Sequence, residues 1–249
     1  MTDTILIDHM TKDYGLGRGA FDITLSVHAG ECYGFLGPNG AGKTTTIRQL
    51  MGFTRPNSGR AEILGRDCWR EAAVLKNHIG YIPGEIVLPA GMTGTGFLRM
   101  MEKMHGITDT SRTEMLIERF RLDTSSGVKK MSFGMKRKLA IITAFMHDPE
   151  ILILDEPSSG LDPLMQKEFI DFLAEEKARG KTLFLSSHIF HEVDVACDRL
   201  SIIKEGHIVS EIDLNARRRE EGAAFDLEQY FMDFYRTDVQ VGKGGETHA

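Results

Sequence analysis

The sequence predicts an α/β fold: a mostly parallel core sheet that carries an antiparallel β subdomain and an inserted helical subdomain. Two buried, β-rich runs at 151–154 and 182–185 indicate the parallel sheet, because the helical segment between them makes a strand–helix–strand unit that needs a crossover. Residues 90–147 indicate the inserted helical subdomain, because their apolar side chains recur at helical spacing without a strong strand pattern. We expect a globular domain over 1–214 and a charged, amphipathic extension over 215–249, whose last residues, 242–249, form a disordered tail.

The antiparallel subdomain is predicted near the N-terminus. Four apolar residues there alternate with polar ones, which is typical of a half-buried strand: Phe21, Ile23, Leu25 and Val27. Two further short apolar stretches, at 5–7 and 61–64, are expected to pair with this strand in a small antiparallel sheet.

The first parallel strand is expected over 32–36, a short apolar run that ends at Gly37. A helix over 44–51 should follow it and stop at Gly52. This order of strand, glycine-rich turn and helix is the context that a phosphate-binding loop requires.

The second half of the chain carries clear boundary signals. Between the strands over 151–154 and 182–185, Asp162 is a suitable helix N-cap, Pro163 suits the first turn and Gly180 suits the C-terminal stop. Residues 202–212 predict a hairpin. Further on, an amphipathic helix is expected over 226–235, with one apolar face formed by Leu227, Tyr230, Phe231 and Phe234. We expect this face to fold back on its own domain, or alternatively to contact a partner subunit.

The composition argues against several classes of protein. The net charge of −6 is mildly acidic, which disfavours general nucleic-acid binding. Cys32, Cys68 and Cys197 form no CxxC pair, so neither a zinc site nor a disulfide framework is predicted, and a reducing compartment fits. The apolar runs are far shorter than the ~20 residues that span a bilayer, and residues 1–10 show no signal peptide, so we expect any membrane role to act through a partner.

A phosphate-binding motif lies between the expected strand and helix. It fits the pattern GxxxxGK[ST] and consists of Gly37, Pro38, Asn39, Gly40, Ala41, Gly42, Lys43 and Thr44. Glycines let backbone N–H groups turn toward an anion, and the following helix presents roughly +0.5 elementary charge at its N-terminus. We expect Lys43 to neutralise the β- and γ-phosphates of ATP, the Thr44 hydroxyl to ligate Mg²⁺, and Thr45 to reach the α-phosphate.

Three polar residues follow predicted parallel strands. Asp155 ends the strand over 151–154, beside the phosphate loop, where it can hold the Mg²⁺ shell. Glu156 is placed to orient and polarise the attacking water, and general-base help is typically worth ~10²–10⁴ in rate. His188 closes the strand that begins at Thr182; a lone histidine is usually structural, but at this position we interpret it as a γ-phosphate sensor.

Taken in order, these motifs resemble those of the ATP-binding subunits of ABC transporters over roughly residues 3–213. Residues 131–135, Met-Ser-Phe-Gly-Met, look like a variant of the family's LSGGQ signature that keeps the serine and one glycine. Ser132 precedes Asp155 by 23 residues, which is the family's usual distance. The resemblance implies a P-loop NTPase fold of the ABC type.

Further positions match the same family. Residues 159–162, Ser-Gly-Leu-Asp, resemble the D-loop, and His188 stands where the family has its switch histidine. Tyr14 stands where the family stacks an aromatic ring on adenine. ATP and Mg²⁺ are therefore the implied cofactors.

The family implies two subunits that face each other head to tail, as a homodimer or a heterodimer. Ser132 and the N–H of Gly134 would then bind the γ-phosphate held by the other subunit. Cations crowd this helix N-terminus, where they are unfavourable unless ATP approaches: Lys129, Lys130, Lys136, Arg137 and Lys138. A solvated basic face is an equal alternative for the flanking lysines, and a nucleic-acid patch is a weaker one because no aromatic ladder accompanies it.

One position departs from the family. Gly84 stands where the family's Q-loop has a glutamine, so no side chain can ligate there. We expect a hinge at Gly84 that uses its access to positive φ, and we expect Glu85 to face the groove where a permease helix would dock. Together with the signature variant, these residues resemble the unfused ATPase subunits of bacterial drug, lantibiotic or bacitracin-type exporters.

The resemblance implies a Mg²⁺-dependent ATPase, peripheral on the cytoplasmic face of the cell membrane, that powers a separate integral-membrane permease. Two other functions stay open: a soluble ABC ATPase that acts on ribosomes or DNA, and a nucleotide-gated regulatory module. The single phosphate motif and the lack of a long heptad run count against the first, and Glu156 counts against the second. We expect no nucleic-acid partner.

Overall fold

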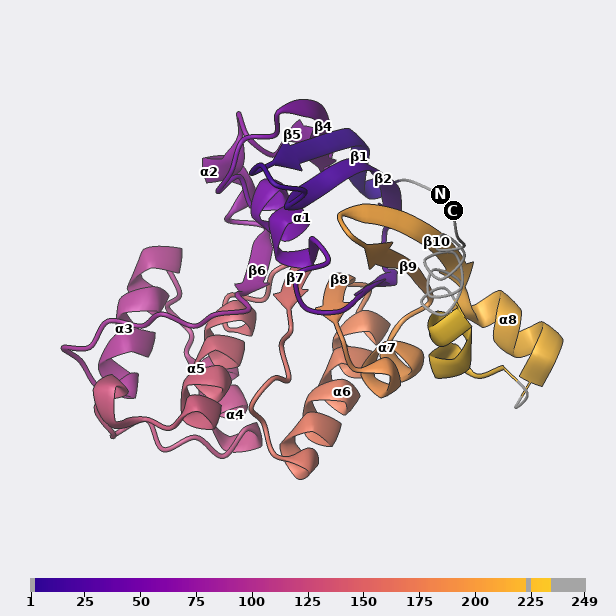
Figure 1. The fold of residues 1–249 in the computed structure, drawn as a ribbon. Coiled ribbons are helices and arrows are strands. Elements are labelled where there is room, and N and C mark those ends of the chain that lie inside the picture. Colours follow the sequence, from indigo (N-terminus) through magenta and orange to yellow (C-terminus); the bar gives the residue numbers. More distant parts are fainter. Residues whose placement is uncertain (1–2, 223–224, 234–249) are drawn as a thin grey trace, which may run out of the picture.

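The structure, a computed structural model, describes residues 3–222 and 225–233. Figure 1 shows a small sheet stacked on a larger one with a helix between them, and further helices on the far side of the larger sheet. The predicted α/β class, with a mostly parallel core sheet and an antiparallel sheet, is confirmed. Among the described residues, none of the helices is long and apolar enough to cross a membrane.

The smaller sheet is antiparallel and has the strand order β2-β1-β4-β5. Its strands are β1 (Asp3–Asp13), β2 (Gly19–His28), β4 (Ser58–Ile63) and β5 (Arg66–Asp67). Their apolar side chains point toward the larger sheet, so Ile5, Ile23 and Leu25 are buried between the two layers.

The larger sheet has the order β10-β9-β3-β8-β7-β6 and is parallel except for the edge strand β10. Its strands are β3 (Cys32–Leu36), β6 (Ile79–Ile82), β7 (Ile151–Asp155), β8 (Thr182–Ser187), β9 (Arg199–Lys204) and β10 (His207–Asp213). Because β3, β8 and β7 are parallel neighbours, their carboxyl ends meet at one edge of the sheet. This edge carries the candidate site.

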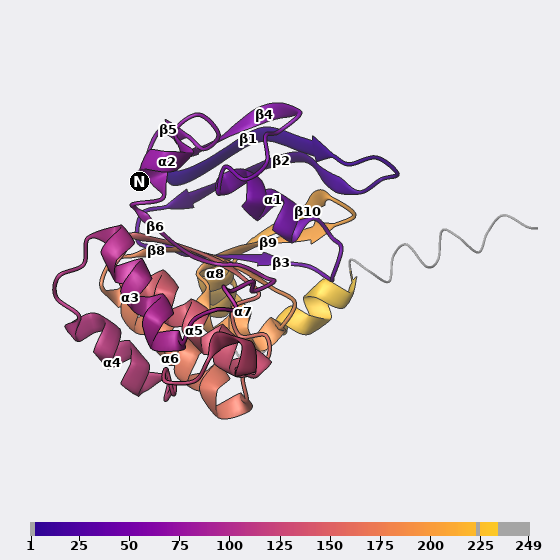
Figure 2. The same ribbon diagram turned by 90° about the vertical axis from the view of Figure 1, so that its left-hand side faces the viewer.

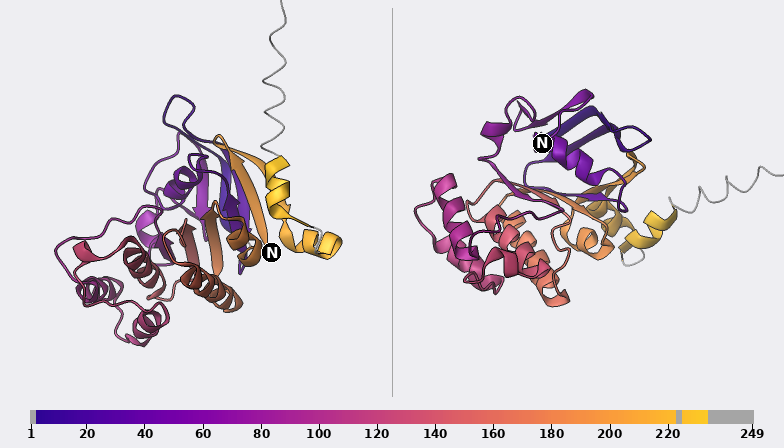
Figure 3. Two further views of the ribbon diagram at one scale, coloured as in Figure 1. Left: turned by 60° about the horizontal axis from the view of Figure 1, so that its bottom comes forward. Right: turned by 60° about the vertical axis from the view of Figure 1, so that its left-hand side comes forward.

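Helices cover both faces of the larger sheet. Figure 2 shows α1 (Lys43–Leu50) between the two sheets. The opposite face is covered by α5 (Phe133–Phe145), α6 (Pro163–Ala178) and α7 (Phe190–Ala196). The other helices are α2 (Ala72–Leu75), α3 (Gly94–His105), α4 (Ser111–Arg119), the 3-10 turn Val128–Lys130 and α8 (Leu214–Glu221). Figure 3 shows the magenta helices α3 and α4 at the end of the molecule away from the yellow C-terminal helices.

The central strands serve two cores. In β3, Tyr33 and Phe35 pack with α1 and the small sheet, whereas Cys32 and Leu36 pack with the helices on the other face. Because both faces of the sheet are covered, such strands carry continuous apolar runs instead of alternating with polar residues. This explains why they are the strongest strand signals in the sequence.

Two expectations about the strands were incomplete. Phe21 does not join the buried face of β2, because Asp22 has φ 53° and the register shifts there, so Ala20 takes the buried place next to Ile23. Phe21 instead stacks on His207, with ring centroids 5.3 Å apart. The strand β6 was not predicted at all; it is four residues long and contains Gly80, which weakens the periodic signal.

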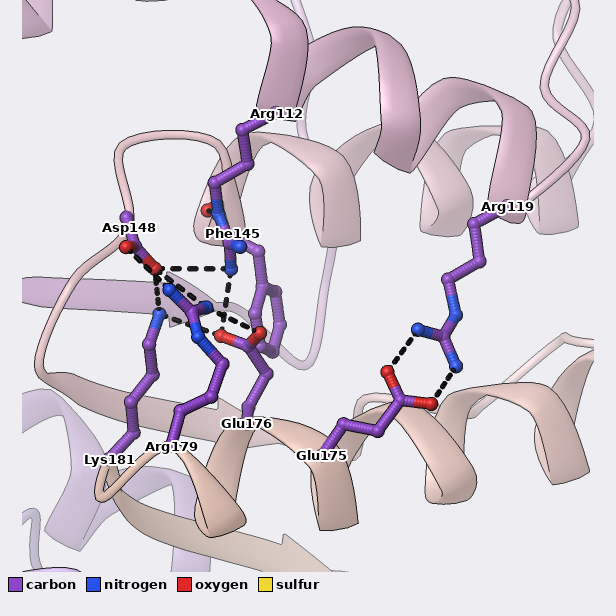
Figure 4. Close-up of polar contacts among 8 residues, drawn as sticks. All are labelled: Arg112, Arg119, Phe145, Asp148, Glu175, Glu176, Arg179 and Lys181. Atoms are coloured by element: carbon purple, nitrogen blue, oxygen red, sulfur yellow. Dashed lines mark hydrogen bonds and ion pairs between the residues drawn. The ribbon is translucent and has the colours of Figure 1, made fainter.

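An ionic anchor holds the helical segment to α6 (Figure 4). It consists of Arg112, Asp148, Glu176, Arg179 and Lys181. Arg112 on α4 donates to the carbonyl of Phe145 at 2.8 Å and to Glu176 at 2.7 Å, and Arg119 on α4 makes a two-pronged contact with Glu175 nearby. Glu176 is almost fully buried, so the anchor is a structural ion network rather than a solvated charge pair.

The C-terminal part folds back on the domain as predicted, as far as it is described. Residues 227–233 are helical, and Leu227 and Phe231 are buried. The ring of Phe231 packs edge-on against Phe190 of α7, with centroids 4.9 Å apart. The rest of the expected amphipathic face, at Phe234, and the expected tail over 242–249 lie outside the described residues.

Candidate active site

The phosphate loop joins β3 to α1 and is shaped by close backbone packing. Gly42 has φ 109°, and a Cβ there would lie 2.7 Å from the carbonyl oxygen of Gly19. Gly40 also has a positive φ, of 83°. Any larger residue at 42 would be strained and would push the loop away from Gly19, the first residue of β2. The loop can therefore present its N–H groups and the N-terminus of α1 to an anion.

Lys43 is folded into this loop. Its side chain is almost fully buried, and its ammonium donates to the carbonyls of Gly37 at 2.6 Å and Pro38 at 3.2 Å. The same nitrogen lies 3.0 Å from Oε1 of Glu156. The lysine thus stands as a point charge inside the loop, which is the arrangement that neutralises a β- or γ-phosphate.

Asp155 ends β7 directly beside the loop. Its carboxylate is fully buried and accepts hydrogen bonds from the hydroxyls of Thr44 at 2.8 Å and Ser186 at 2.5 Å. Within 3–222 and 225–233, no group of three or more His, Cys, Asp or Glu side chains could hold a metal. A hydroxyl and one carboxylate beside a phosphate site nevertheless suit Mg²⁺, which usually binds one or two protein ligands together with substrate phosphates and water.

Glu156 turns sharply out of β7. It has φ 49°, a left-handed conformation that costs a non-glycine residue about 1 kcal/mol or more, and its N–H donates to the carbonyl of Ser186 at 3.0 Å. Oε2 lies 2.5 Å from Nδ1 of His188. The buried Oε1 accepts no hydrogen bond of acceptable geometry, although the Lys43 ammonium is close. The backbone therefore holds this carboxylate over the loop with one oxygen available to a hydrogen-bond donor.

These side chains share one hollow of about 150 Å³. It is lined by Pro38, Asn39, Gly40, Gly42, Lys43, Thr44, Thr45 and Glu156. Asp155 and His188 reach its edge through their bonds to Thr44 and Glu156. The structure thus brings together the phosphate motif and all three polar residues expected at the strand ends.

Tyr14 is not a member of this group. It begins the turn between β1 and β2, is half exposed, and has the ammonium of Lys12 5.5 Å from its ring centre. The turn reaches the phosphate loop through Gly19, which packs on Gly42. Leu16 lies at the tip of the same turn with 94% of its surface exposed, and the sequence analysis did not single it out. The adenine-stacking role of Tyr14 stays a prediction.

The signature residues also lie apart from the hollow. Ser132 is the N-cap of α5, where its hydroxyl accepts from the N–H of Met135 at 3.2 Å. Ser132 is exposed, and neither Ser132 nor Gly134 lines the hollow at the phosphate loop. Gly134 packs on its own D-loop, because a Cβ there would lie 2.9 Å from the carbonyl oxygen of Gly160. Within one chain, the two halves of the expected site are therefore separate.

The expected explanation for Gly84 was wrong. Gly84 does not adopt a positive φ, so conformational freedom is not why glycine stands there. A Cβ at this position would lie 2.9 Å from Oδ2 of Asp155, and the Gly84 carbonyl is held by Arg137. The residue is thus a close-packed contact to Asp155 rather than a free joint, and Glu85 beside it is exposed.

Two buried charged residues at this edge were missed. Glu192 on α7 accepts hydrogen bonds from Ser158 and from Ser187, the latter at 2.8 Å, and burial raises the pKa of its carboxyl. Arg137 was grouped with the neighbouring lysines as a cation at the start of the helix, but its side chain is fully buried. Helical spacing was the available signal: Arg137 lies four residues before Ile141, on the apolar face of α5.

Residues 20–159 match the family model described as ABC transporter. The bacitracin transport ATP-binding protein BcrA of Bacillus licheniformis is 40% identical over 217 residues, which cover 85% of this chain and 70% of that protein. The Nod factor export ATP-binding protein I of Paraburkholderia xenovorans is 36% identical over 212 residues, which cover 83% of this chain and 70% of that protein. A solved structure of the ATP-binding subunit of an ABC transporter is 30% identical with a TM-score of 0.82 and covers 92% of this chain and 98% of that one.

Proposed function

The chain belongs to the ABC transporter family and is an ATP-hydrolysing subunit of it, and from this premise we propose that two such subunits clamp ATP head to tail and drive a separate permease. One observation carries the proposal: the phosphate loop and the acid that would activate water share a hollow, whereas the signature is exposed elsewhere on the same chain. A site with one half missing is completed by a second copy or a close relative of this chain.

Binding of ATP follows from the loop. The N–H groups around Gly40 and Gly42 and the N-terminus of α1 receive the phosphates, while the Lys43 ammonium exchanges its carbonyl contacts for phosphate oxygens. Thr44 and Asp155 are the residues that would hold Mg²⁺, which neutralises charge on the β- and γ-phosphates when bound. Thr45 lines the same hollow and is available to the α-phosphate.

Hydrolysis needs a water aimed at the γ-phosphate, and Glu156 is the acid in place to hold one. Its Oε2 is bound to His188, which fixes the carboxylate. Oε1 lies 3.0 Å from the Lys43 ammonium, and among the described residues no donor makes a hydrogen bond of good geometry to it. A carboxylate so held can accept a proton from water as the water attacks, an effect typically worth ~10²–10⁴ in rate. His188 is 45% exposed, so its ring can also reach a phosphate from outside the loop.

The partner subunit completes the site. Ser132 and the N–H groups at the start of α5 offer donors and a positive helix end, and the first turn of α5 contains no acidic residue. A γ-phosphate held by the other subunit would accept hydrogen bonds from these donors and would offset the positive charge of the helix end. Binding of ATP then joins the two subunits, and hydrolysis separates them.

We place the subunit on the cytoplasmic face of the membrane, where a permease converts this cycle into export. The named relatives support that direction, since one is a transport and the other an export ATP-binding protein. The exposed Glu85, next to the contact between Gly84 and Asp155, is suitably placed to receive the permease.

Affinity purification from solubilised membranes tests the proposal. We expect the tagged chain to retain a polytopic membrane protein whose addition changes the rate of ATP hydrolysis. The variant Glu156→Gln should retain the same partner without hydrolysis. Sedimentation of the chain with ribosomes or DNA, and no effect of the membrane protein on hydrolysis, would favour the soluble ATPase instead.

A further inference from the structure

Arg137 occupies an unusual position for a charged residue. It lies on α5 with its side chain fully buried, and among the described residues no carboxylate forms an ion pair with it. Its guanidinium donates instead to three backbone carbonyls: Pro83 at 2.9 Å, Gly84 at 2.9 Å and Ser159 at 3.1 Å. Burial lowers the pKa of Arg137, and the Asp155 and Glu156 carboxylates act in the opposite direction.

The three carbonyls belong to two loops that leave the catalytic edge of the sheet. One loop follows β6 and contains Gly84, whose Cα packs on the Asp155 carboxylate. The other loop follows β7 and begins at Glu156. Ser159, whose carbonyl accepts from Arg137, is three residues after Glu156 in the sequence. A planar fork of five donors can bind both loops at once, whereas a lysine ammonium acts as a point charge.

The same arginine also holds the start of its own helix. Its guanidinium lies over the ring of Phe133, 5.5 Å from the centroid, and that ring packs on Gly160 so closely that a Cβ there would lie 2.1 Å from a ring atom. Phe133 directly follows Ser132. The exposed signature segment is therefore locked to the loop that begins at Glu156 of the same chain.

We propose that Arg137 is a positioning residue that couples the two ATP sites of the dimer. The inference rests on the head-to-tail clamp proposed above. Through Gly84 and Ser159, Arg137 responds to Asp155 and Glu156, which serve the ATP bound by its own chain. Through Phe133 it sets Ser132, which serves the ATP bound by the partner. A change at one site is thus transmitted to the other across one side chain.

The variant Arg137→Met tests this coupling, and Arg112→Met is the matched control. Arg112 also ties the helical segment to the core and donates to a backbone carbonyl, but it lies in the ionic anchor away from the hollow. Each variant loses a guanidinium from a contact between the helical segment and the core of the domain. Only Arg137→Met should lower the Hill coefficient of ATP hydrolysis toward 1, and only Arg137→Met should change the dimerisation of Glu156→Gln protein.

In the Glu156→Gln background, we expect Arg137→Met to raise the ATP concentration needed for dimers by about tenfold or more, as typical coupling free energies imply. Binding of a fluorescent ATP analogue to monomers should change less than about twofold, since Arg137 does not line the hollow. Arg137→Lys should restore part of both the dimerisation and the Hill coefficient. If Arg137→Met does not fold, Arg137→Lys decides by the same readouts.

The outcomes separate the two proposals. If Glu156→Gln alone forms no ATP-dependent dimer, the clamp and the coupling both fail. If it dimerises and folded Arg137→Met leaves dimerisation and the Hill coefficient unchanged, the clamp stands and the coupling is overturned. Where Arg137→Met does not fold, the same result in Arg137→Lys overturns the coupling. Equal loss in Arg112→Met and Arg137→Met would also overturn it, because the effect would then be general stability.

Discussion

The two halves of the ATP site are built in opposite ways. At the phosphate half, Lys43 begins α1, and Asp155 and Glu156 lie at the end of β7. Direct contacts within one chain hold all three side chains. At the signature half, Ser132 is exposed, and among the described residues its hydroxyl has the N–H of Met135 as its one hydrogen-bond partner. The first half is complete before any ligand arrives, whereas the second offers unsatisfied helix-end groups to another molecule. The difference shows which part of the site the chain supplies to itself and which part it supplies to a partner.

The largest effect should follow from breaking the complete half at Glu156. Glu156→Gln keeps the shape but removes the basic oxygen, so kcat should fall by ~10²–10⁴ while ATP still binds. Steady-state hydrolysis and binding of a labelled nucleotide measure the two effects. Glu150→Gln, at the other end of β7, is the matched control and should keep its activity. Turnover within a few-fold of the original in Glu156→Gln would remove this residue from the chemistry.

At the signature half, hydrolysis should be lowered by a negative charge at position 132 even when the helix cap is kept. Aspartate is a good N-cap, so Ser132→Asp should keep α5 stable, yet it places a carboxylate where the partner's γ-phosphate would bind. At a separation of ~4 Å near a surface this repulsion is worth about 4 kcal/mol, so hydrolysis should fall by at least about a hundredfold.

The control for Ser132→Asp is Thr93→Asp. Thr93 is the exposed N-cap of α3 and accepts from the N–H of Gly96 at 3.1 Å. Thermal unfolding and hydrolysis are compared for the two variants, and both should melt near the original temperature. Normal hydrolysis in a folded Ser132→Asp variant would mean that the signature does not meet ATP.

A smaller effect than at either half is expected at Tyr14. Stacking on a base is worth ~1–3 kcal/mol, so Tyr14→Ala should weaken ATP binding by about 5–150-fold and Tyr14→Phe should bind nearly normally. Calorimetric titration with ATP and GTP measures both, and we expect little discrimination between the two purines. Since Leu16 shares the turn, Leu16→Ala is the informative control. A loss of affinity in Leu16→Ala but not in Tyr14→Ala would move the contact to Leu16.

The smallest effect should come from the far end of α5. Burial lowers the pKa of His147 to about 4, and its ring stacks on His105 with centroids 4.1 Å apart. The unfolded chain takes up this proton near pH 6.5, so it binds more protons than the folded chain between about pH 6.5 and 4. Stability is therefore lost as pH falls through this window.

His147→Phe should reduce that acid sensitivity without changing the affinity for ATP. Melting temperatures between pH 7 and pH 5 measure the slope for both proteins. His9 provides a control in which the effect of pH on stability has the opposite sign. Its hydrogen bond to Asp22 raises the pKa of His9, so the folded chain binds this proton more tightly than the unfolded chain. An unchanged slope in His147→Phe would show that His147 does not titrate in this range.

The sequence predicted the phosphate half because its information is local. The phosphate motif is contiguous, Asp155 and Glu156 adjoin an apolar strand, and Asp162 and Gly180 mark the ends of α6. Each of these signals lies within a few residues of the feature that it predicts. The fold class followed from the same short segments.

The missed features depend on contacts between distant segments. The carbonyl partners of Arg137 lie 54, 53 and 22 residues away, so the basic run around it gave no sign that one member is buried. Gly84 is explained by its fit against Asp155, not by its own conformation. The alternating pattern also gave no sign of the shift in strand register at Asp22, which turns Phe21 away from the core.

Crosslinking tests the central claim, that each ATP is held between two chains, most directly. Asn39 lines the hollow and Ser132 caps α5, both are exposed, and the native cysteines Cys32, Cys68 and Cys197 are buried. Asn39→Cys protein is mixed with Ser132→Cys protein, both carrying Glu156→Gln, and treated with a short thiol crosslinker. We predict an ATP-dependent dimer that joins position 39 of one chain to position 132 of the other and that forms only in the mixture. A link between two copies of position 132, or no link while ATP is bound, would contradict the account.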